Sequence, residues 1–216
     1  MGDRLKHQRR GKGGSVFRAK AKGIDSAYIT YDDAQKEGAL IGQVVKLIKE
    51  NGRNCIMAKI LFENKAIGNV VAAEGLREGQ AIKYGKDAGV AIGNTLPLSN
   101  IPEGCPMFNV EIRQGDGGKF ARGSGDYALL VSKGEKNAYV KLPSGKTKAI
   151  DLRSRATIGC VSGGGRPEKP FVKAGNKWRS MKAKSRPYPT NRGVAMNPVA
   201  HPFGGSQHHA GKSKST

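Results

Sequence analysis

Residues 39–62 read ALIGQVVKLIKENGRNCIMAKILF, and they hold the pattern that decides the fold. Two apolar runs of ten and eight residues, rich in Ile, Leu and Val, flank a polar stretch containing Asn51-Gly52. Short runs of this composition, bounded by Gly or Asn, are typical of β-strands. Asn-Gly is a hairpin signal, although here more than two residues separate the runs. The stretch therefore predicts two neighbouring strands.

The same pattern continues on the C-terminal side. Runs at 67–75 and 79–85 predict further strands, whereas 92–104 is punctuated by Pro and Gly and predicts a loop. Four or five short strands of nearly neutral charge fit a small barrel of the oligonucleotide-binding type. We assign this first barrel to residues 38–106.

A second set of short strands predicts an SH3-like barrel over residues 107–165. The predicted strands are 108–114, 127–133, 137–143, 146–152 and 157–162. Ser144-Gly145 forms a short turn between two of them. Loops on a rigid scaffold usually carry function. The basic residues assigned to these loops are candidate RNA contacts: Lys119, Arg122, Arg153 and Arg155.

The net charge of +21 is distributed unevenly. Residues 1–24 carry +7, 25–112 carry −2, 113–165 carry +6 and 166–216 carry +10. A polyanionic partner explains this placement better than a need for solubility. The basic ends have no amphipathic apolar face for a membrane surface, and no stretch approaches the ~20 apolar residues of a membrane span. Nucleic acid is therefore the expected partner.

We assign residues 1–37 to a basic N-terminal extension, whose first 23 residues offer only Val16 and Phe17 as apolar anchors and have little to fold around. Its cations are candidate phosphate contacts, although a solvated tail without defined contacts is the alternative. These candidates are Arg9, Arg10, Lys12, Arg18, Lys20 and Lys22.

The C-terminal extension, residues 166–216, is basic and rich in Gly and Pro. Gly163–Gly165 would let the backbone approach a phosphate beside Arg166. The single tryptophan, Trp178, lies among cations and can stack on a base, or pack on the neighbouring barrel instead. A short helix within 169–183 is compatible with the pattern. The candidate RNA contacts here are Arg166, Lys177, Trp178, Arg179, Lys182 and Lys184.

Residues 186–205, RPYPTNRGVAMNPVAHPFGG, contain four prolines, which exclude a helix or an inner strand. Composition alone favours a disordered tail. The segment repeats nothing, however, so a stiff cationic strand wrapped by nucleic acid is the other interpretation. Its candidate contacts are Arg186, Arg192, Asn197, His201 and Gly204.

The spacing of the cysteines and glycines does not match the motifs of metal sites or nucleotide-binding enzymes. Cys55, Cys105 and Cys160 lie far apart without CxxC spacing, which indicates free thiols in a reducing compartment and no zinc site. The glycines before Gly211-Lys212-Ser213 are misplaced for a phosphate loop, and no helix can follow. We expect no catalytic residue, no metal and no cofactor beyond Mg²⁺ associated with RNA.

Seven motifs resemble, in the same order, those of the universal family of large-subunit ribosomal protein number two, in its eukaryotic and archaeal form. They are RGKGGSVFRA (10–19), AAEGL (72–76), IGNTLPL with IPEG (92–104), GDGGKFARGSGDYA (115–128), VKLPSGKTK (140–148), GGGRPEKP (163–170) and GVAMNPVAHPFGG (193–205). The chain departs from the family at Ala200, where an acidic residue is usual beside the histidine. It also has GIDSAYITYDD (23–33) where a basic segment is expected.

The resemblance implies an oligonucleotide-binding-type barrel, an SH3-like barrel and extensions threaded through large-subunit ribosomal RNA. Residues 119–127 and 163–179, with Arg192, Asn197, His201 and Gly204, are then expected against RNA. It further implies a structural, non-catalytic role around the peptidyl transferase region in cytoplasmic translation. Neighbouring large-subunit proteins are expected partners, and contact with the small subunit is a further expectation.

Two rival functions are less favoured. A free nucleic-acid chaperone would share the charge but would not need two ordered barrels. An RNA-directed enzyme would need carboxylates or a metal cluster in the basic half, whereas residues 166–216 contain one acid, Glu168.

Overall fold

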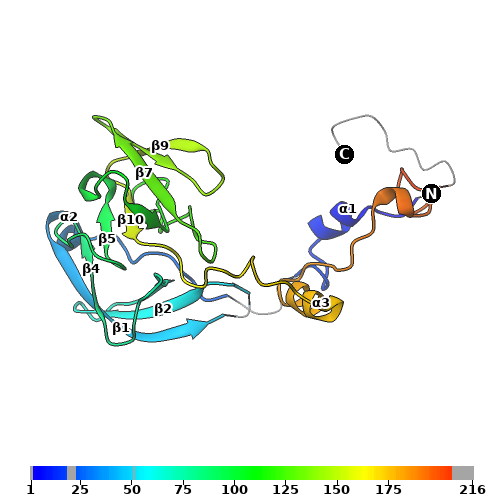
Figure 1. The fold of residues 1–216 in the computed structure, drawn as a ribbon, viewed down its shortest axis with the longest axis horizontal. Helices are drawn as coiled ribbons and strands as arrows, with labels where there is room; N and C mark the ends of the chain where they lie inside the picture. The colour runs from blue at the N-terminus through cyan, green and yellow to red at the C-terminus, as the bar shows by residue number, and fades with distance from the viewer. Residues whose placement is uncertain (1, 19–22, 51, 206–216) are drawn as a thin grey trace. The chain divides into compact units, whose positions relative to one another are not determined.

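The structure is a computed structural model that describes residues 2–18, 23–50 and 52–205. The chain divides into two compact units (Figure 1). Residues 23–170 form the β unit, which holds every strand in the described ranges. Parts of 1–22 and 171–216 together form the second, the terminal unit.

The β unit contains one ten-stranded sheet in the order β3-β2-β1-β4-β5-β10-β6-β7-β8-β9. Its strands are β1 Ala39–Lys49, β2 Ile56–Phe62, β3 Ile67–Val71, β4 Ala81–Gly85, β5 Thr95–Pro97, β6 Pro106–Phe108, β7 Ala128–Lys133, β8 Asn137–Lys141, β9 Thr147–Asp151 and β10 Arg155–Ile158. The short helix α2, Asp33–Glu37, and the 3₁₀ turn η1, Leu98–Asn100, complete the unit. The prediction of a mainly β protein is confirmed.

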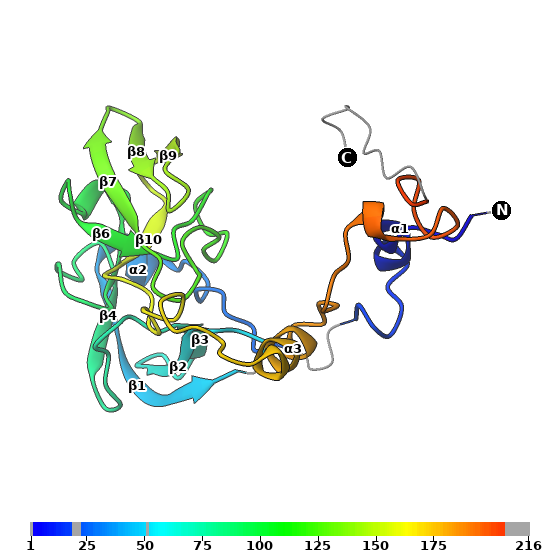
Figure 2. The ribbon, with the colours of Figure 1, turned by 45° about the vertical axis from the view of Figure 1, so that its right-hand side comes forward.

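The long strand β1 organises the first half of the sheet. Its first residues pair with β4 and its later residues with β2, and the strand bends between these partners (Figure 2). Leu40, Gly42 and Val44 face the interior in alternation, as a period of two requires. The register shift at Val44 to Lys46 is a β-bulge, which bends a strand and sharpens its twist.

The segment 92–104 is not the simple loop that its prolines and glycines suggested. Thr95–Pro97 form β5, which lies parallel to β4 at Tyr84 and antiparallel to β10. Leu98 and Ile101 are fully buried just after it. Pro97 is accommodated because it falls at the end of a three-residue strand. This short strand joins the two halves of the sheet.

The predicted strand 108–114 is wrong beyond its first residue. Chain pairing in β6 ends at Phe108, and Asn109 adopts a positive φ of 50°. Only an isolated bridge between Val110 and Phe120 follows. The apolar alternation of FNVEIRQ misled the prediction because Glu111 points into the interior instead of to solvent.

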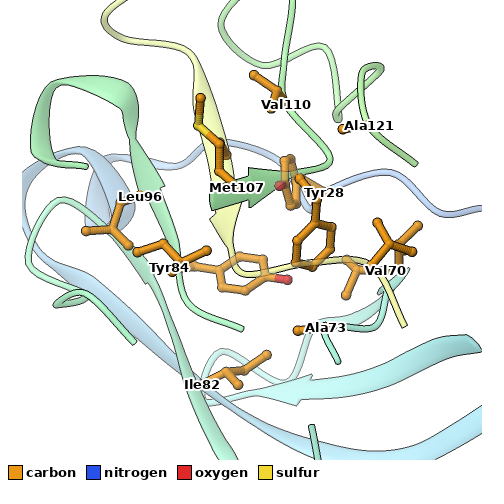
Figure 3. Close-up of a cluster of buried hydrophobic side chains, with 14 of the residues drawn as sticks. Tyr28, Val70, Ala73, Ile82, Tyr84, Leu96, Met107, Val110 and Ala121 are labelled. Atoms are coloured by element: carbon orange, nitrogen blue, oxygen red, sulfur yellow. The ribbon is translucent and has the colours of Figure 1, made fainter. Parts of the chain in front are cut away.

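One apolar core runs through the β unit (Figure 3). The Tyr84 ring meets Phe62 and Tyr28 edge-to-face, with centroids 5.0 and 5.9 Å apart. The Tyr28 hydroxyl is hydrogen-bonded to the Thr157 hydroxyl at 2.6 Å, and burial raises the pKa of Tyr28 far above its usual range. Met107, Val110 and Ala121 from the second half lie in the same cluster as Val70 and Ile82 from the first.

A buried ion pair crosses this core. Arg155 in β10 and Glu111 are 1% and 0% exposed, with Nη2 and Oε1 2.7 Å apart. The Glu111 carboxylate also accepts the backbone N–H groups of Gly115, Gly117 and Arg155. The guanidinium donates to the Gln35 side-chain oxygen at 3.0 Å. Every charged atom is therefore paired, as a buried charge requires.

The ion pair also fixes the segment that precedes the sheet. The Arg155 guanidinium lies 5.1 Å from the ring centroid of Tyr28 and 4.4 Å from that of Tyr31. It also donates to the Ile29 carbonyl. The segment 23–33 is thus anchored to the core through Tyr28 and Tyr31.

The terminal unit contains α1 Lys6–Gly11, α3 Ala174–Ala183 and the 3₁₀ turn η2 Gly193–Ala195. The helix expected within 169–183 is confirmed, whereas α1 was not expected in the N-terminal extension. The two ends of the chain bond to one another inside this unit. The Asp3 N–H donates to the Val199 carbonyl at 2.6 Å, and the Ser185 hydroxyl donates to the Arg18 carbonyl at 2.8 Å.

Two features of the predicted fold remain predictions. They are the types of the two barrels, oligonucleotide-binding and SH3-like, and their boundaries at 38–106 and 107–165. The hairpin signal at Asn51 lies outside the described residues. Cys55, Cys105 and Cys160 are free thiols, and burial raises the pKa of each. In the described ranges, no helix is both long and apolar enough to cross a membrane.

We expect Glu111→Gln to lower the free energy of unfolding by about 3–5 kcal/mol, because Arg155 would stay buried without a countercharge. Urea unfolding of the purified chain measures this. The double variant Glu111→Leu with Arg155→Met should be less destabilised than Glu111→Gln, since it buries no charge. Lys36→Met, which removes the exposed Lys36–Asp33 pair, is the control and should leave the midpoint unchanged. A Glu111→Gln midpoint equal to that of the control would contradict the role of the pair.

Candidate nucleic-acid interface

The β unit carries a surface hollow of about 530 Å³, which we call the arginine hollow. It lies among segments 25–26, 53–55, 122–126 and 166–167. Its charged lining consists of Arg53, Arg122, Arg166, Asp25 and Asp126.

Two of the arginines converge on one hydroxyl. Arg53 and Arg122 both donate to the Ser26 Oγ, and Arg122 also donates to the carbonyls of Ser26 at 2.8 Å and Gly118 at 3.0 Å. Glu50 forms an ion pair with Arg53 at 3.0 Å. Arg122 forms no ion pair with any residue that the structure describes. Of the two guanidinium groups, only that of Arg53 is paired with a carboxylate among the described residues.

This arrangement leaves the half-buried Arg122 guanidinium without a salt bridge to any described residue, although the carboxylates of Asp25 and Asp126 also line the hollow. Burial, and then the neighbouring Arg53 charge, lower the pKa of Arg122 from its usual value. An anion in the hollow would relieve both effects. Guanidinium groups are well suited to phosphate oxygens because their planar donors match the geometry of the anion.

Two glycine loops form one wall of the arginine hollow. A Cβ on Gly125 would lie 2.8 Å from the Gly164 Cα, and one on Gly163 would lie 3.0 Å from the Asn54 carbonyl oxygen. The glycines at 163–165 were expected to admit a phosphate. In the structure their first requirement is close approach to other parts of the chain. The contact holds the two loops together, and Arg166 donates to the Ser124 hydroxyl across them at 3.2 Å.

The predicted contacts of the β unit separate into three groups. Arg122 and Arg166 meet in the arginine hollow, together with Arg53, which sequence reasoning missed. Lys119 and Arg153 are exposed. Arg155 is a correction, because it lies in β10, fully buried, with its guanidinium bonded to Glu111. Nothing in the sequence around Arg53 distinguished it from other turn arginines.

The predicted contacts of the N-terminal extension lie in the terminal unit. Arg9 and Arg10 are on α1 and Lys12 follows it, and all three are exposed, as is Arg18. Arg10 lies over the Phe17 ring at 5.8 Å. Lys20 and Lys22 lie outside the described residues.

The helix α3 carries most of the predicted contacts of the C-terminal extension. Trp178, Arg179 and Lys182 are exposed on it, and Lys177 is partly exposed. Lys184 is the residue at its C-terminal end, and Arg186 follows. Helix formation despite Gly175 aligns Trp178 and Lys182 one turn apart, so the Lys182 ammonium lies 4.5 Å from the centre of the indole.

The segment 193–205 folds back on itself rather than running as an extended strand. The His201 and Ala200 N–H groups donate to the Asn197 carbonyl, and the Gly205 N–H donates to the Met196 carbonyl. A Cβ on Gly204 would collide with the Met196 and Asn197 carbonyl oxygens. The glycine at 204 is thus required by the chain itself. Arg192 and Asn197 remain exposed beside this turn.

His201 is held by its own turn. The Phe203 N–H donates to the imidazole Nδ1 at 3.1 Å, and the Phe203 ring meets the imidazole at 5.2 Å. The His201 imidazole also fills the space beside Gly193, where any Cβ would collide with it. Since Nδ1 accepts, the neutral ring carries its proton on Nε2. Sequence reasoning found no group that orients this histidine, and the structure shows that the backbone and Phe203 do so.

Comparison with known proteins assigns the family. Residues 91–216 match the family model described as Ribosomal Proteins L2, C-terminal domain. The large ribosomal subunit protein uL2 of Pyrobaculum calidifontis is 50% identical over 213 residues, covering 98% of this chain and 86% of the relative. The uL2 protein of Methanocaldococcus jannaschii is 48% identical over 98% of this chain and 89% of its own length. That of Halorubrum lacusprofundi is 48% identical over 100% and 90%. The chain therefore belongs to the family of large ribosomal subunit protein uL2.

Proposed function

We propose that the chain is a structural protein of the large ribosomal subunit that binds large-subunit ribosomal RNA through the arginine hollow and the terminal unit. The observation that carries the proposal is the convergence of two guanidinium groups on Ser26, where Arg122 has no ion-pair partner among the described residues. Phosphate is the anion that RNA supplies at every nucleotide, and phosphate contacts position such proteins without reading sequence.

The terminal unit supplies the larger part of the charge. Residues 2–18 contain six Lys and Arg, and residues 171–205 contain seven, against the single acid Asp3. Cations on α1 and α3 are exposed and largely free of carboxylates, so RNA phosphates are their natural counterions.

The role is architectural. The protein supports assembly of the RNA around the peptidyl transferase region in the cytoplasmic large subunit, next to neighbouring large-subunit proteins and within reach of the small subunit. It needs no cofactor of its own, and Mg²⁺ associates with the RNA. In the described ranges, no three His, Cys, Asp or Glu side chains gather as metal ligands. The function is not enzymatic, since His201 is held by hydrogen bonds that suit positioning and has no neighbouring carboxylate at Ala200.

The salt dependence of RNA binding tests the arginine hollow. We expect the affinity for a large-subunit RNA fragment to fall steeply with salt, because bound phosphates release counterions. Arg122→Gln combined with Arg166→Gln should reduce the slope of log K against log salt by about 0.7–0.9 for each lost contact. Filter binding over a salt series measures it. Arg77→Gln, an exposed cation on the loop before β4, is the matched control. A double-variant slope equal to that of the control would overturn the role of the hollow.

A second test separates positioning from chemistry in segment 193–205. We expect assembled subunits with His201→Gln to retain most peptide-bond formation, since an amide can still accept the Phe203 N–H. Gly204→Val should impair assembly more, because its side chain would meet two carbonyl oxygens. Assembly is measured by sedimentation and chemistry by the rate on purified subunits. A rate loss of orders of magnitude in fully assembled His201→Gln subunits would show proton chemistry instead.

A further inference from the structure

The terminal unit contains a hollow of about 500 Å³, which we call the tryptophan slot. Trp178 and Lys182 of α3 line it, and so do Pro187, Tyr188 and Pro189 from the chain after the helix. Val16 of the N-terminal segment lines it as well. The lining is thus aromatic and apolar, although it lies in the most basic part of the chain.

The slot leaves apolar side chains exposed to solvent, which packing within the chain does not explain. Trp178 is 44% exposed and Val16 is 63% exposed, so large apolar surfaces face solvent side by side. α3 has no buried residue. The partners of Trp178 in the slot all belong to the terminal unit.

The charges around the slot select the occupant. The Lys182 ammonium lies 4.5 Å from the centre of the Trp178 ring, and the Lys177 ammonium lies 5.2 Å from that of Tyr188. Arg186 is a third cation on the lining. An apolar, aromatic cavity rimmed by cations fits a flat aromatic group that carries anionic neighbours on both sides. A nucleotide within an RNA strand has this structure.

We propose that the tryptophan slot binds one unpaired nucleobase of RNA, stacked on Trp178, with its flanking phosphates on Lys182 and Arg186. The inference rests on the proposed RNA-binding function and names the group that this surface recognises. The flexible lysine stem lets the ammonium leave the indole for a phosphate as the base enters. Stacking tolerates every base, because each has an aromatic face.

The single tryptophan of the chain gives a direct readout. The full chain is titrated with a single-stranded RNA of about 12 nucleotides, within the usual range of site sizes, and with an abasic oligomer of equal length. We expect the RNA to quench Trp178 emission and the abasic oligomer, which keeps the phosphates, to leave the emission unchanged. Equal quenching by both oligomers would overturn the slot.

Substitutions measure the contribution of the stack. Trp178→Leu should weaken RNA binding about 5- to 150-fold, with the salt slope and the affinity for the abasic oligomer unchanged. Trp178→Phe keeps a ring and should stay within about threefold of the parent. Phe171→Leu is the matched control, since Phe171 is also 44% exposed in the same unit but does not line the slot. It should change nothing.

Three results separate the possible failures. If Trp178→Leu weakens both oligomers equally, the residue acts on the fold or on phosphates, and base stacking is overturned. If Trp178→Leu binds RNA as well as the parent, the slot is not a base site and a protein ligand becomes its occupant. If the parent chain binds neither oligomer at low salt, the proposed RNA-binding function itself fails, and the slot fails with it.

Discussion

The buried ion pair between Glu111 and Arg155 is the constraint on which the β unit depends. A charge removed from water must be matched fully or the fold is penalised by several kcal/mol. Matching this one requires Glu111 to leave the strand after Phe108, Gln35 to enter the interior, and the loop at Gly115 and Gly117 to turn its N–H groups inward. These requirements join two distant parts of the sequence, Gln35 and the stretch 111–117, to Arg155. They hold the N-terminal segment, the loop and β10 in one arrangement.

The arginine hollow follows from that arrangement. The segment carrying Tyr28 and Tyr31 against Arg155 also carries Ser26, on which Arg53 and Arg122 converge. The core thus holds the buried Ser26 at a fixed position beside the hollow. A flexible segment would let the two like charges separate.

Periodicity predicted the strands well where one face is buried and the other is exposed to solvent, as in the first half of β1 and in β8. It could not predict β5, because Thr95–Pro97 is buried completely and its proline and flanking glycines are typical of loops. Periodicity also placed Glu111 in a strand wrongly. An acidic residue between two apolar ones is typical of the solvent-facing position of a strand, whereas Glu111 is buried. Nothing in the sequence was a reason to treat Arg153 and Arg155 differently as RNA contacts. Only the structure shows that Arg155 is buried against Glu111 while Arg153 is exposed. For Gly163 and Gly204, the sequence indicated a close approach of the backbone, but it could not tell RNA from the protein's own backbone.

The meeting of the two chain ends in one unit also has a consequence for synthesis. A chain emerges N-terminus first, and domains generally fold as they emerge. Residues 23–170 are complete in themselves, so the sheet can close early. The hydrogen bond from Asp3 to Val199 can form only after both the β unit and Val199 have been made. The basic terminal unit is therefore completed after the β unit, which delays its capture of stray nucleic acid until the sheet has folded.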